Sequence, residues 1–157
     1  MVDGRTFVDI ASCKAFYHVC MQVHVASEHG AILTMGCDDD TNVSPVRVWL
    51  LDSTAAYAWQ EVLCACVMVD AHITCAAVPS HLSDVALGLS DGRVYVLHAL
   101  SDSMHAKEPH IIKPKLAREA SFVDESTEPD VVSGLVIDAS TLLIATVSGT
   151  LKFACLL

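Results

Sequence analysis

Apolar residues occur along the chain in short runs of about six to eight residues, and turn-forming residues separate these runs. Such runs are typical of β-strands rather than of helices, which need a longer period. Three of the runs align when the chain is compared with itself: 33–38, 85–90 and 143–148. Gly36, Gly88 and Thr146 occupy equivalent places in them, so the repeat spacing is 52 and then 58 residues.

Each aligned run is preceded and followed by another apolar run. The preceding runs are 19–25, 72–78 and 131–137, and the following runs are 46–51, 93–97 and 151–156. A repeat of roughly 40–50 residues with several strands is the sequence mark of a β-propeller blade. The pattern therefore predicts an all-β, WD-repeat-like β-propeller fragment with antiparallel blades, and insertions in the connecting loops account for the long spacing.

The turns support the same repeat. Asp91-Gly92 stands between two runs, and Asp-Gly is a strong hairpin signal because glycine tolerates positive φ. Gly149 holds the matching place in the last repeat, and the segment 3–8 resembles 91–96. We therefore expect one partial propeller domain over 1–157, starting and stopping within a blade. Its three to four blades form an incomplete ring and occupy these segments: 1–16 (partial), 17–70, 71–125 and 130–157 (partial).

Two regions do not follow the repeat. Segment 54–61 contains good helix formers behind a Ser53 or Thr54 cap, which predicts one or two helical turns before a fourth strand over 61–69. Segment 101–129 is polar and contains three prolines, which predicts a long loop around one short strand near 117–123.

Composition and charge narrow the classes of partner. The chain has 157 residues, 53% hydrophobic and 18% charged, enough for one buried core. Its formal charge of −10 disfavours nucleic acid and anionic lipid as direct partners. The longest clean apolar run, 62–69, is too short to cross a bilayer, and the charged start is unlike a secretory signal.

Cysteine usage indicates a reducing compartment. The seven cysteines are an odd number, and most lie within apolar runs, unlike a secreted disulfide framework. We expect buried free thiols and a cytosolic protein. Cys64 and Cys66 lack zinc-knuckle spacing and would share one face of a strand, which suits core packing. Two His–Cys pairs are similarly isolated, and neither predicts a metal site: His72 with Cys75, and His18 with Cys20.

The acidic run Asp38–Asp40 resembles the start of a calcium loop. An EF-hand requires glycine at its sixth position and glutamate at its twelfth, where this chain has Val43 and Trp49. The run is therefore interpreted as a solvated hairpin turn, with contact to a basic partner as the alternative. Trp49 is expected to pack in the core.

Catalytic motifs are not found in the sequence. A nucleophile elbow, a phosphate-binding loop, a dinucleotide fingerprint and a zinc-protease motif are all missing. The sequence therefore predicts a protein that is not an enzyme, with no catalytic, cofactor-binding or metal-binding residue.

Segment 30–100 resembles a known family. The stretch 32–40, followed by Pro45 and the Val46-Arg47-Val48-Trp49-Leu50 run, is similar to the N-terminal propeller of the family of the eleventh vacuolar protein sorting protein. That family has a strand, an acidic loop, a proline and then a V-K-I-W-N-L pattern there. Segments 73–78 and 85–94 are similar to its next blade.

The resemblance implies a non-catalytic scaffold region of a core subunit of the HOPS and CORVET tethering complexes. These complexes bring endosomal and lysosomal or vacuolar membranes together before fusion. The expected partners are other protein subunits, and the expected place is cytoplasmic and peripheral on late endosome, lysosome or vacuole membranes. The family's α-solenoid and zinc-binding RING domain have no counterpart in this sequence, so their functions are not carried over. The alternative is a generic WD-repeat-like interaction module of an unrelated complex.

The last strand has consequences for solution behaviour. Segment 151–157 is apolar, prone to β-structure and free of proline, and Lys152 is its only charge. We expect the isolated chain to aggregate or to associate, in spite of its net charge.

Overall fold

The computed structural model describes residues 14–16, 19–37, 43–52, 58–68, 71–104, 111–112, 120–121, 130–138 and 140–156. Within these ranges the chain forms twelve strands and one short helix, and the strands make three sheets. All strand pairs are antiparallel except the pair formed by β4 and β8. The prediction of an all-β fold is confirmed, and each of the nine predicted runs lies largely on a strand of its own.

Sheet A has the strand order β1-β2-β3-β4-β8. Its strands are β1 (Val19–Ala26), β2 (Ala31–Cys37), β3 (Val43–Asp52), β4 (Ala58–Met68) and β8 (Ile111–Ile112). Sheet B has the order β5-β6-β7-β9, from β5 (Ile73–Ala77), β6 (Asp84–Leu89), β7 (Arg93–His98) and β9 (Ala120–Ser121). Sheet C has the order β10-β11-β12, from β10 (Val132–Asp138), β11 (Thr141–Thr146) and β12 (Leu151–Cys155).

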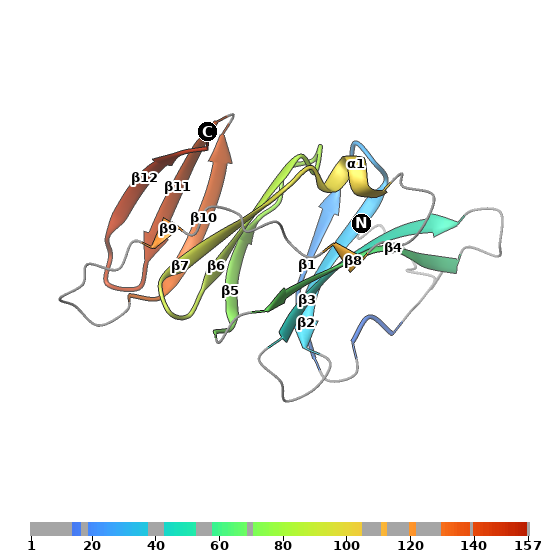
Figure 1. Ribbon diagram of the computed structural model, residues 1–157, viewed down its shortest axis with the longest axis horizontal. Coiled ribbons are helices and arrows are strands. Elements are labelled where there is room, and N and C mark those ends of the chain that lie inside the picture. The colour runs from blue at the N-terminus through green and yellow to red at the C-terminus, as the bar shows by residue number, and fades with distance from the viewer. Residues whose placement is uncertain are drawn as a thin grey trace, which may run out of the picture.

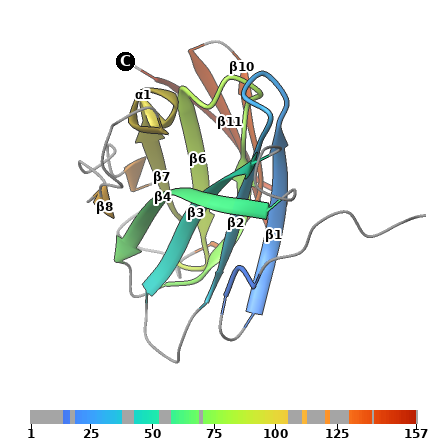
Figure 2. The ribbon, with the colours of Figure 1, turned by 90° about the vertical axis from the view of Figure 1, so that its right-hand side faces the viewer.

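The three sheets stand in a row, with sheet B between sheets A and C (Figure 1). Figure 2 shows the row from the end formed by sheet A. Segments 17–70, 71–125 and 130–157, each expected to hold one blade, contain the strands of sheets A, B and C in turn. Only β8, which leaves segment 71–125 to join sheet A, departs from this order. Of segment 1–16, residues 14–16 are described.

The three sheets share irregularities of strand pairing, and two of them share the same type of turn. The first hairpin of each sheet has a register irregularity at the same place: between Cys20 and Gln22, between Ile73 and Cys75, and between Val132 and Gly134. The turn glycines predicted from sequence have positive φ, +85° at Gly92 and +88° at Gly149. Their N–H groups donate to Leu89 O (3.2 Å) and Thr146 O (3.0 Å), which closes equivalent turns.

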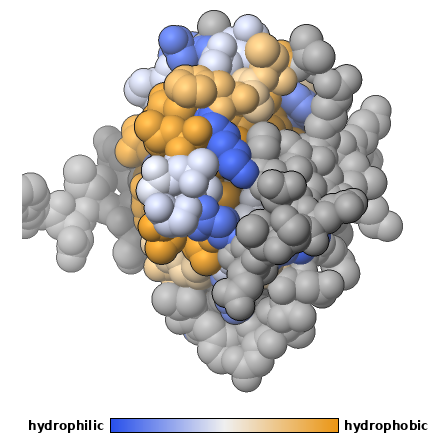
Figure 3. Space-filling model, turned by 90° about the vertical axis from the view of Figure 1, so that its left-hand side faces the viewer, coloured by the Kyte–Doolittle hydropathy of each residue, from blue (hydrophilic) through white to orange (hydrophobic). Residues whose placement is uncertain are grey.

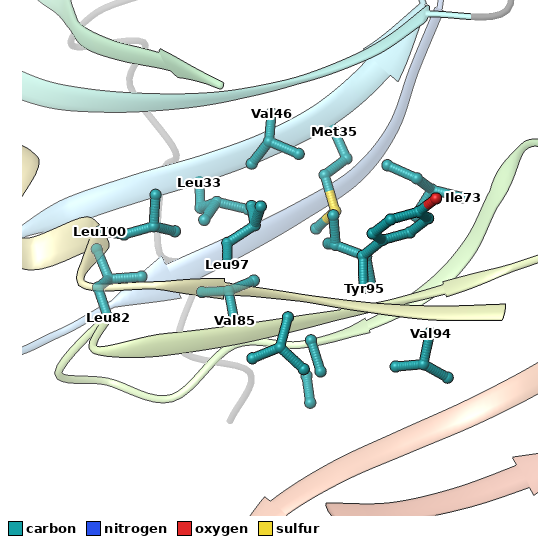
Figure 4. Packing of buried hydrophobic residues seen from close by; sticks show 14 of the residues in the cluster. Leu33, Met35, Val46, Ile73, Leu82, Val85, Val94, Tyr95, Leu97 and Leu100 are labelled. Carbon is teal, nitrogen blue, oxygen red and sulfur yellow. The ribbon is translucent and has the colours of Figure 1, made fainter. Parts of the chain in front are cut away.

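The main core lies between sheets A and B. Leu33, Met35 and Val46 of sheet A point toward Tyr95 and Leu97 of sheet B (Figure 4). Alternation along β7 turns Val94 to the opposite face, toward sheet C (Figure 4). One hydrophobic cluster therefore runs through all three sheets and includes residues of sheet C, such as Leu142 and Ile144.

The predicted helix over 54–61 is wrong where the structure describes it. Ala58 and Glu61 lie in β4 and pair with Asp52 and Trp49 of β3, respectively. Pairing with β3 thus overrides the helix propensity of this segment, because tertiary context outweighs small propensity differences. Residues 54–57 lie outside the described residues.

Segment 101–129 contains more structure than the predicted loop. Helix α1 (Leu100–Met104) begins directly after β7 and places Leu100 and Met104 in the core. Strand β8 then pairs with β4, and β9, which lies within the strand expected near 117–123, pairs with β7. The segment thereby connects sheets A and B.

Candidate interaction surfaces

The predicted packing role of Trp49 is confirmed. Its side chain is 8% exposed, and its indole Nε1–H donates to Thr34 Oγ1 at 2.8 Å. Thr34 is itself buried, so the two polar groups satisfy each other inside sheet A.

The prediction of buried thiols is wrong for two of the described cysteine side chains. Cys20 and Cys155 are exposed, and Cys75 is half-buried. Cys155 lies on the outer face of sheet C, where no described element covers it, so the apolar pattern of β12 does not produce burial. Burial nevertheless raises the pKa of the Cys75 thiol. Cys13 and the side chains of Cys37, Cys64 and Cys66 lie outside the described residues.

The remaining sequence candidates are described only in part. His72 is exposed, and its backbone N–H donates to Ser90 Oγ at 3.1 Å in a contact between strand ends. His18 and the acidic run Asp38–Asp40 lie outside the described residues. Across the ranges that the structure describes, no three His, Cys, Asp or Glu side chains are grouped as metal ligands. The helix in these ranges is too short to cross a membrane.

Hydrogen bonds between sheets A and B join residues in successive repeats. Gln22 Nε2 donates to Thr74 O (3.0 Å), and Ser80 Oγ donates to Glu28 Oε1 (2.5 Å), each pair being 52 residues apart. His29 Nε2 donates to the carbonyl oxygen of His81 (2.9 Å) with the same separation. The sheets therefore meet with equivalent residues side by side.

Sheets B and C meet in the same way. The Thr74 hydroxyl lies 2.5 Å from Val132 O, 58 residues further along, and 3.1 Å from Gly88 O. A Cβ added at Gly88 would lie 2.6 Å from Cys75 Sγ and 2.6 Å from Val132 Cγ1. Only a residue without a side chain allows the two sheets to approach this closely at this point.

Each sheet has two faces because side chains alternate along its strands. We call the face that is turned to the next sheet along the chain the following face, and the opposite one the preceding face. The following face of sheet A bears Leu33 and Met35 and meets the preceding face of sheet B, which bears Tyr95 and Leu97. The following face of sheet B bears Gly88 and Val94 and meets sheet C.

The following face of sheet C is exposed and mostly apolar, and Asp138, Thr141 and Cys155 form one further row at its end. The strand register places Val136, Leu143 and Phe153 in one row across the sheet, with Leu151 and Ala145 in the next. We call these five residues the C-end face. Val136 is 55% exposed, Leu151 62% and Phe153 73%. Figure 3 looks at this end of the molecule and shows hydrophobic residues on it beside hydrophilic ones.

The preceding face of sheet A is exposed along β1. Met21 is 43% exposed, Val23 60% and Val25 69%, and we call these three residues the A-end strip. Nearer β3, residues 14–16 lie against this face: the Arg47 guanidinium is 4.8 Å from the centre of the Phe16 ring and donates to the backbone oxygen of Ala15. The molecule thus has an exposed apolar surface at each end of its row of sheets.

Charged side chains stabilise strand ends. Asp91 forms an ion pair with Arg93 (2.5 Å) beside the β6–β7 turn, and Asp84 Oδ1 is hydrogen-bonded to His98 Nδ1 (2.6 Å) at the other end of these strands. The Asp130 carboxylate accepts from the Ser148 backbone N–H (3.1 Å) and hydroxyl (2.5 Å). Hydrogen bonds from Ser148, and then from Thr146, lower the pKa of Asp130. These contacts are structural, because each carboxylate already serves a neighbouring turn or strand.

Comparisons with known proteins give no family for this chain. No family model matches it, and no curated protein matches it. One similar solved structure is described as "Crystal structure of the computationally designed Ika4 protein"; it is 15% identical, with 96% of this chain and 99% of that chain covered and a TM-score of 0.42. The chain paths differ too much at this score for the likeness to inform fold or function.

Proposed function

We propose that this chain is a β-propeller segment that acts as a non-catalytic scaffold and binds other proteins. The observation that supports this most directly is the serial packing of three antiparallel sheets, with the following face of one against the preceding face of the next. Propeller blades pack in this way around their ring. Inter-sheet hydrogen bonds between residues 52 and 58 apart fit the same repeat.

The narrower proposal is that the scaffold belongs to a vesicle-tethering complex of the HOPS and CORVET type. Its support is the resemblance over residues 30–100, whose quoted segments fall on β2, β3, β5, β6 and β7. The partners would be other protein subunits of that complex. The chain would then act in the cytoplasm on late endosome, lysosome or vacuole membranes, which it would reach through those partners.

Charge and surface chemistry agree with protein partners. A net charge of −10 steers the chain toward basic protein surfaces and away from phosphate-rich ones. Exposed apolar side chains such as Phe153 and Val25 supply contact area of the kind found at interface centres. No step of this function requires a reacting group, a metal or a cofactor.

The test is capture by purified subunits. The tagged chain is mixed with each subunit of the two tethering complexes, and binding is measured by interferometry at 50 and 200 mM salt. A triple variant that replaces Asp38, Asp39 and Asp40 with asparagine serves as the matched control for a basic partner. We expect at least one subunit to bind, more weakly at high salt, and more weakly still to the variant if the acidic run contributes.

Two other outcomes have distinct meanings. If the folded chain binds no tethering subunit, the trafficking proposal is wrong. If it then captures subunits of another assembly from cell extract, with binding confirmed between purified components, it is the generic interaction module. A catalytic activity that purifies with the chain and is lost on a single substitution would contradict the scaffold proposal altogether.

A further inference from the structure

We propose that two copies of this chain associate head to tail, the C-end face of each copy covering the A-end strip and preceding face of the other. This inference rests on the blade-like packing of the proposed function and names one partner, a second copy of the same chain. The surfaces involved are the two exposed apolar ends of the row of sheets. Both surfaces remain exposed after the three sheets of one copy have packed together.

The first argument is continuity with the interfaces that the chain already forms. Within one copy, a following face meets a preceding face twice, between sheets A and B and between sheets B and C. The C-end face is a following face without a described cover, and β1 bears part of a preceding face without one. A second copy therefore supplies the surface that each end lacks.

The second argument compares equivalent positions. The turn glycines Gly92 and Gly149 are 57 residues apart, so Leu151 and Phe153 of β12 correspond to Val94 and Val96 of β7. Sheet C covers the face that bears the two valines, which are 0% and 5% exposed. Leu151 and Phe153 are 62% and 73% exposed. The same strand positions are thus buried where a sheet follows and exposed where none is described.

The third argument is that most of the surface to be covered is apolar. The C-end face consists of Val136, Leu143, Ala145, Leu151 and Phe153, and the A-end strip consists of Met21, Val23 and Val25. Lys152 points to the opposite face of sheet C because side chains alternate along β12. Asp138, the carboxylate on the same face of sheet C, lies with Thr141 and Cys155 in the row at the end of the β10–β11 hairpin. Arg47, on the preceding face of sheet A, is already in contact with Phe16 and Ala15. Association would therefore remove apolar area from water if Asp138 stays at the rim of the interface.

The fourth argument concerns closure. A head-to-tail interface closes into a ring or grows into an open filament, depending on the rotation that it applies. Two copies with three described sheets each contribute six sheets, and propellers typically close with 4–8 blades. A closed pair of copies is therefore the expected assembly.

The test is sedimentation velocity of the full chain over a range of concentrations. The wild type should form a species of twice the mass of one copy. Phe153→Glu and Val23→Glu should each shift the chain to monomer, because each places a charge in both interfaces of the ring. Val147→Glu is the matched control: Val147 is 69% exposed but lies in the turn after β11, so this variant should remain a dimer.

A mixing experiment tests the head-to-tail geometry. An equimolar mixture of Phe153→Glu and Val23→Glu chains retains one unaltered interface, so it should form a heterodimer although each chain alone is monomeric. Cys155 provides a second readout, since it lies on the same face of β12 as Phe153 and is exposed. Its alkylation should be slower in the wild-type dimer than in the Phe153→Glu monomer. Circular dichroism serves to check that each variant is folded.

Several results would overturn the proposal. A wild type that is monomeric at all concentrations excludes a second copy as the occupant. Dimers that resist Phe153→Glu exclude the C-end face, and dimers that resist only Val23→Glu show that this face pairs with itself. Continued growth into longer species excludes the ring. A monomeric chain that still binds a tethering subunit would leave the proposed function intact, so the two failures are distinguishable.

Discussion

The contact between sheets B and C makes Gly88 sensitive to a single methyl group. In Gly88→Ala the new Cβ would lie 2.6 Å from Val132 Cγ1 and 2.6 Å from Cys75 Sγ, and 2.9 Å from Val132 Cβ. Carbon atoms pack at about 3.5–4.0 Å, so the sheets must separate by roughly 1 Å or the side chains must turn. Thr74 hydrogen-bonds across the same interface and would resist this separation.

The expected cost follows from two opposing terms. Overpacking of this kind destabilises by about 1–3 kcal/mol, while replacing glycine restricts the unfolded chain and returns about 0.4–1 kcal/mol. The two ranges leave a net loss of up to about 2.6 kcal/mol for Gly88→Ala, and the 2.6 Å contacts favour a value of about 1–2 kcal/mol. For a chain of this length, that loss lowers Tm by about 2–8 °C.

Gly134→Ala is the matched control. Gly134 also lies in a strand, on β10, but its added Cβ would be 3.7 Å from Ala145 Cβ, an ordinary contact. This variant should be neutral or slightly stabilising. Thermal and urea unfolding are followed by circular dichroism at one protein concentration, because association makes Tm concentration-dependent.

Val132→Ala supplies the second control, because it removes Cγ1 from the crowded site and leaves Cβ in place. The loss in the Gly88→Ala, Val132→Ala double variant should be smaller than the sum of the single losses by about 1 kcal/mol. If Gly88→Ala is as stable as Gly134→Ala, or if the double variant shows simple additivity, sheets B and C do not pack as closely as described.

Three further predictions concern the core and one turn. Trp49→Phe should lower the free energy of unfolding in urea by about 1–3 kcal/mol, because it leaves the buried Thr34 hydroxyl without its indole donor. If the losses of Trp49→Phe and Thr34→Val are additive in the double variant, the two side chains do not interact. Leu100→Ala should cost about 2–5 kcal/mol, since this side chain of α1 is 1% exposed, and a loss below 1 kcal/mol would place α1 outside the core. Asp130→Asn should reduce Tm at pH 7 but much less at pH 3. Hydrogen bonds from Ser148 lower the pKa of Asp130 in the folded state. The stabilisation by the carboxylate is therefore present above about pH 4 and is lost as the pH falls through the folded-state pKa. Equal differences in Tm at both pH values would contradict this assignment.

The local pattern of the sequence predicted the strands well because strand formation depends on short-range alternation and turn chemistry. The repeat of 52 and 58 residues reappears in hydrogen bonds such as that between Gln22 and Thr74. The Asp91-Gly92 turn forms as expected, since only its glycine requires a positive φ there. The strands and the turn are set by residues close together in the sequence, whereas these hydrogen bonds join residues one repeat apart.

Features set by distant partners could not be predicted in the same way. Ala58 and Glu61 favour helix on propensity but pair with β3, and α1 forms where a loop was expected. Leu100 was a visible signal for α1, because an apolar residue directly after β7 can continue into the core. In the structure Leu100 lies beside Leu82 (Figure 4), and no local pattern reveals this packing between separate segments.

The exposure of the C-end face shows that an apolar strand pattern does not by itself predict burial. Alternation in β12 places Leu151 and Phe153 on one face, just as alternation in β7 places Val94 and Val96 on theirs. The two strands are equally apolar by sequence, yet one face is covered and the other is open. An alternating strand specifies which residues share a face, while burial requires a second surface with matching shape. The prediction of buried thiols was wrong at Cys155 for this reason, and the expected association of the chain follows from the same open face.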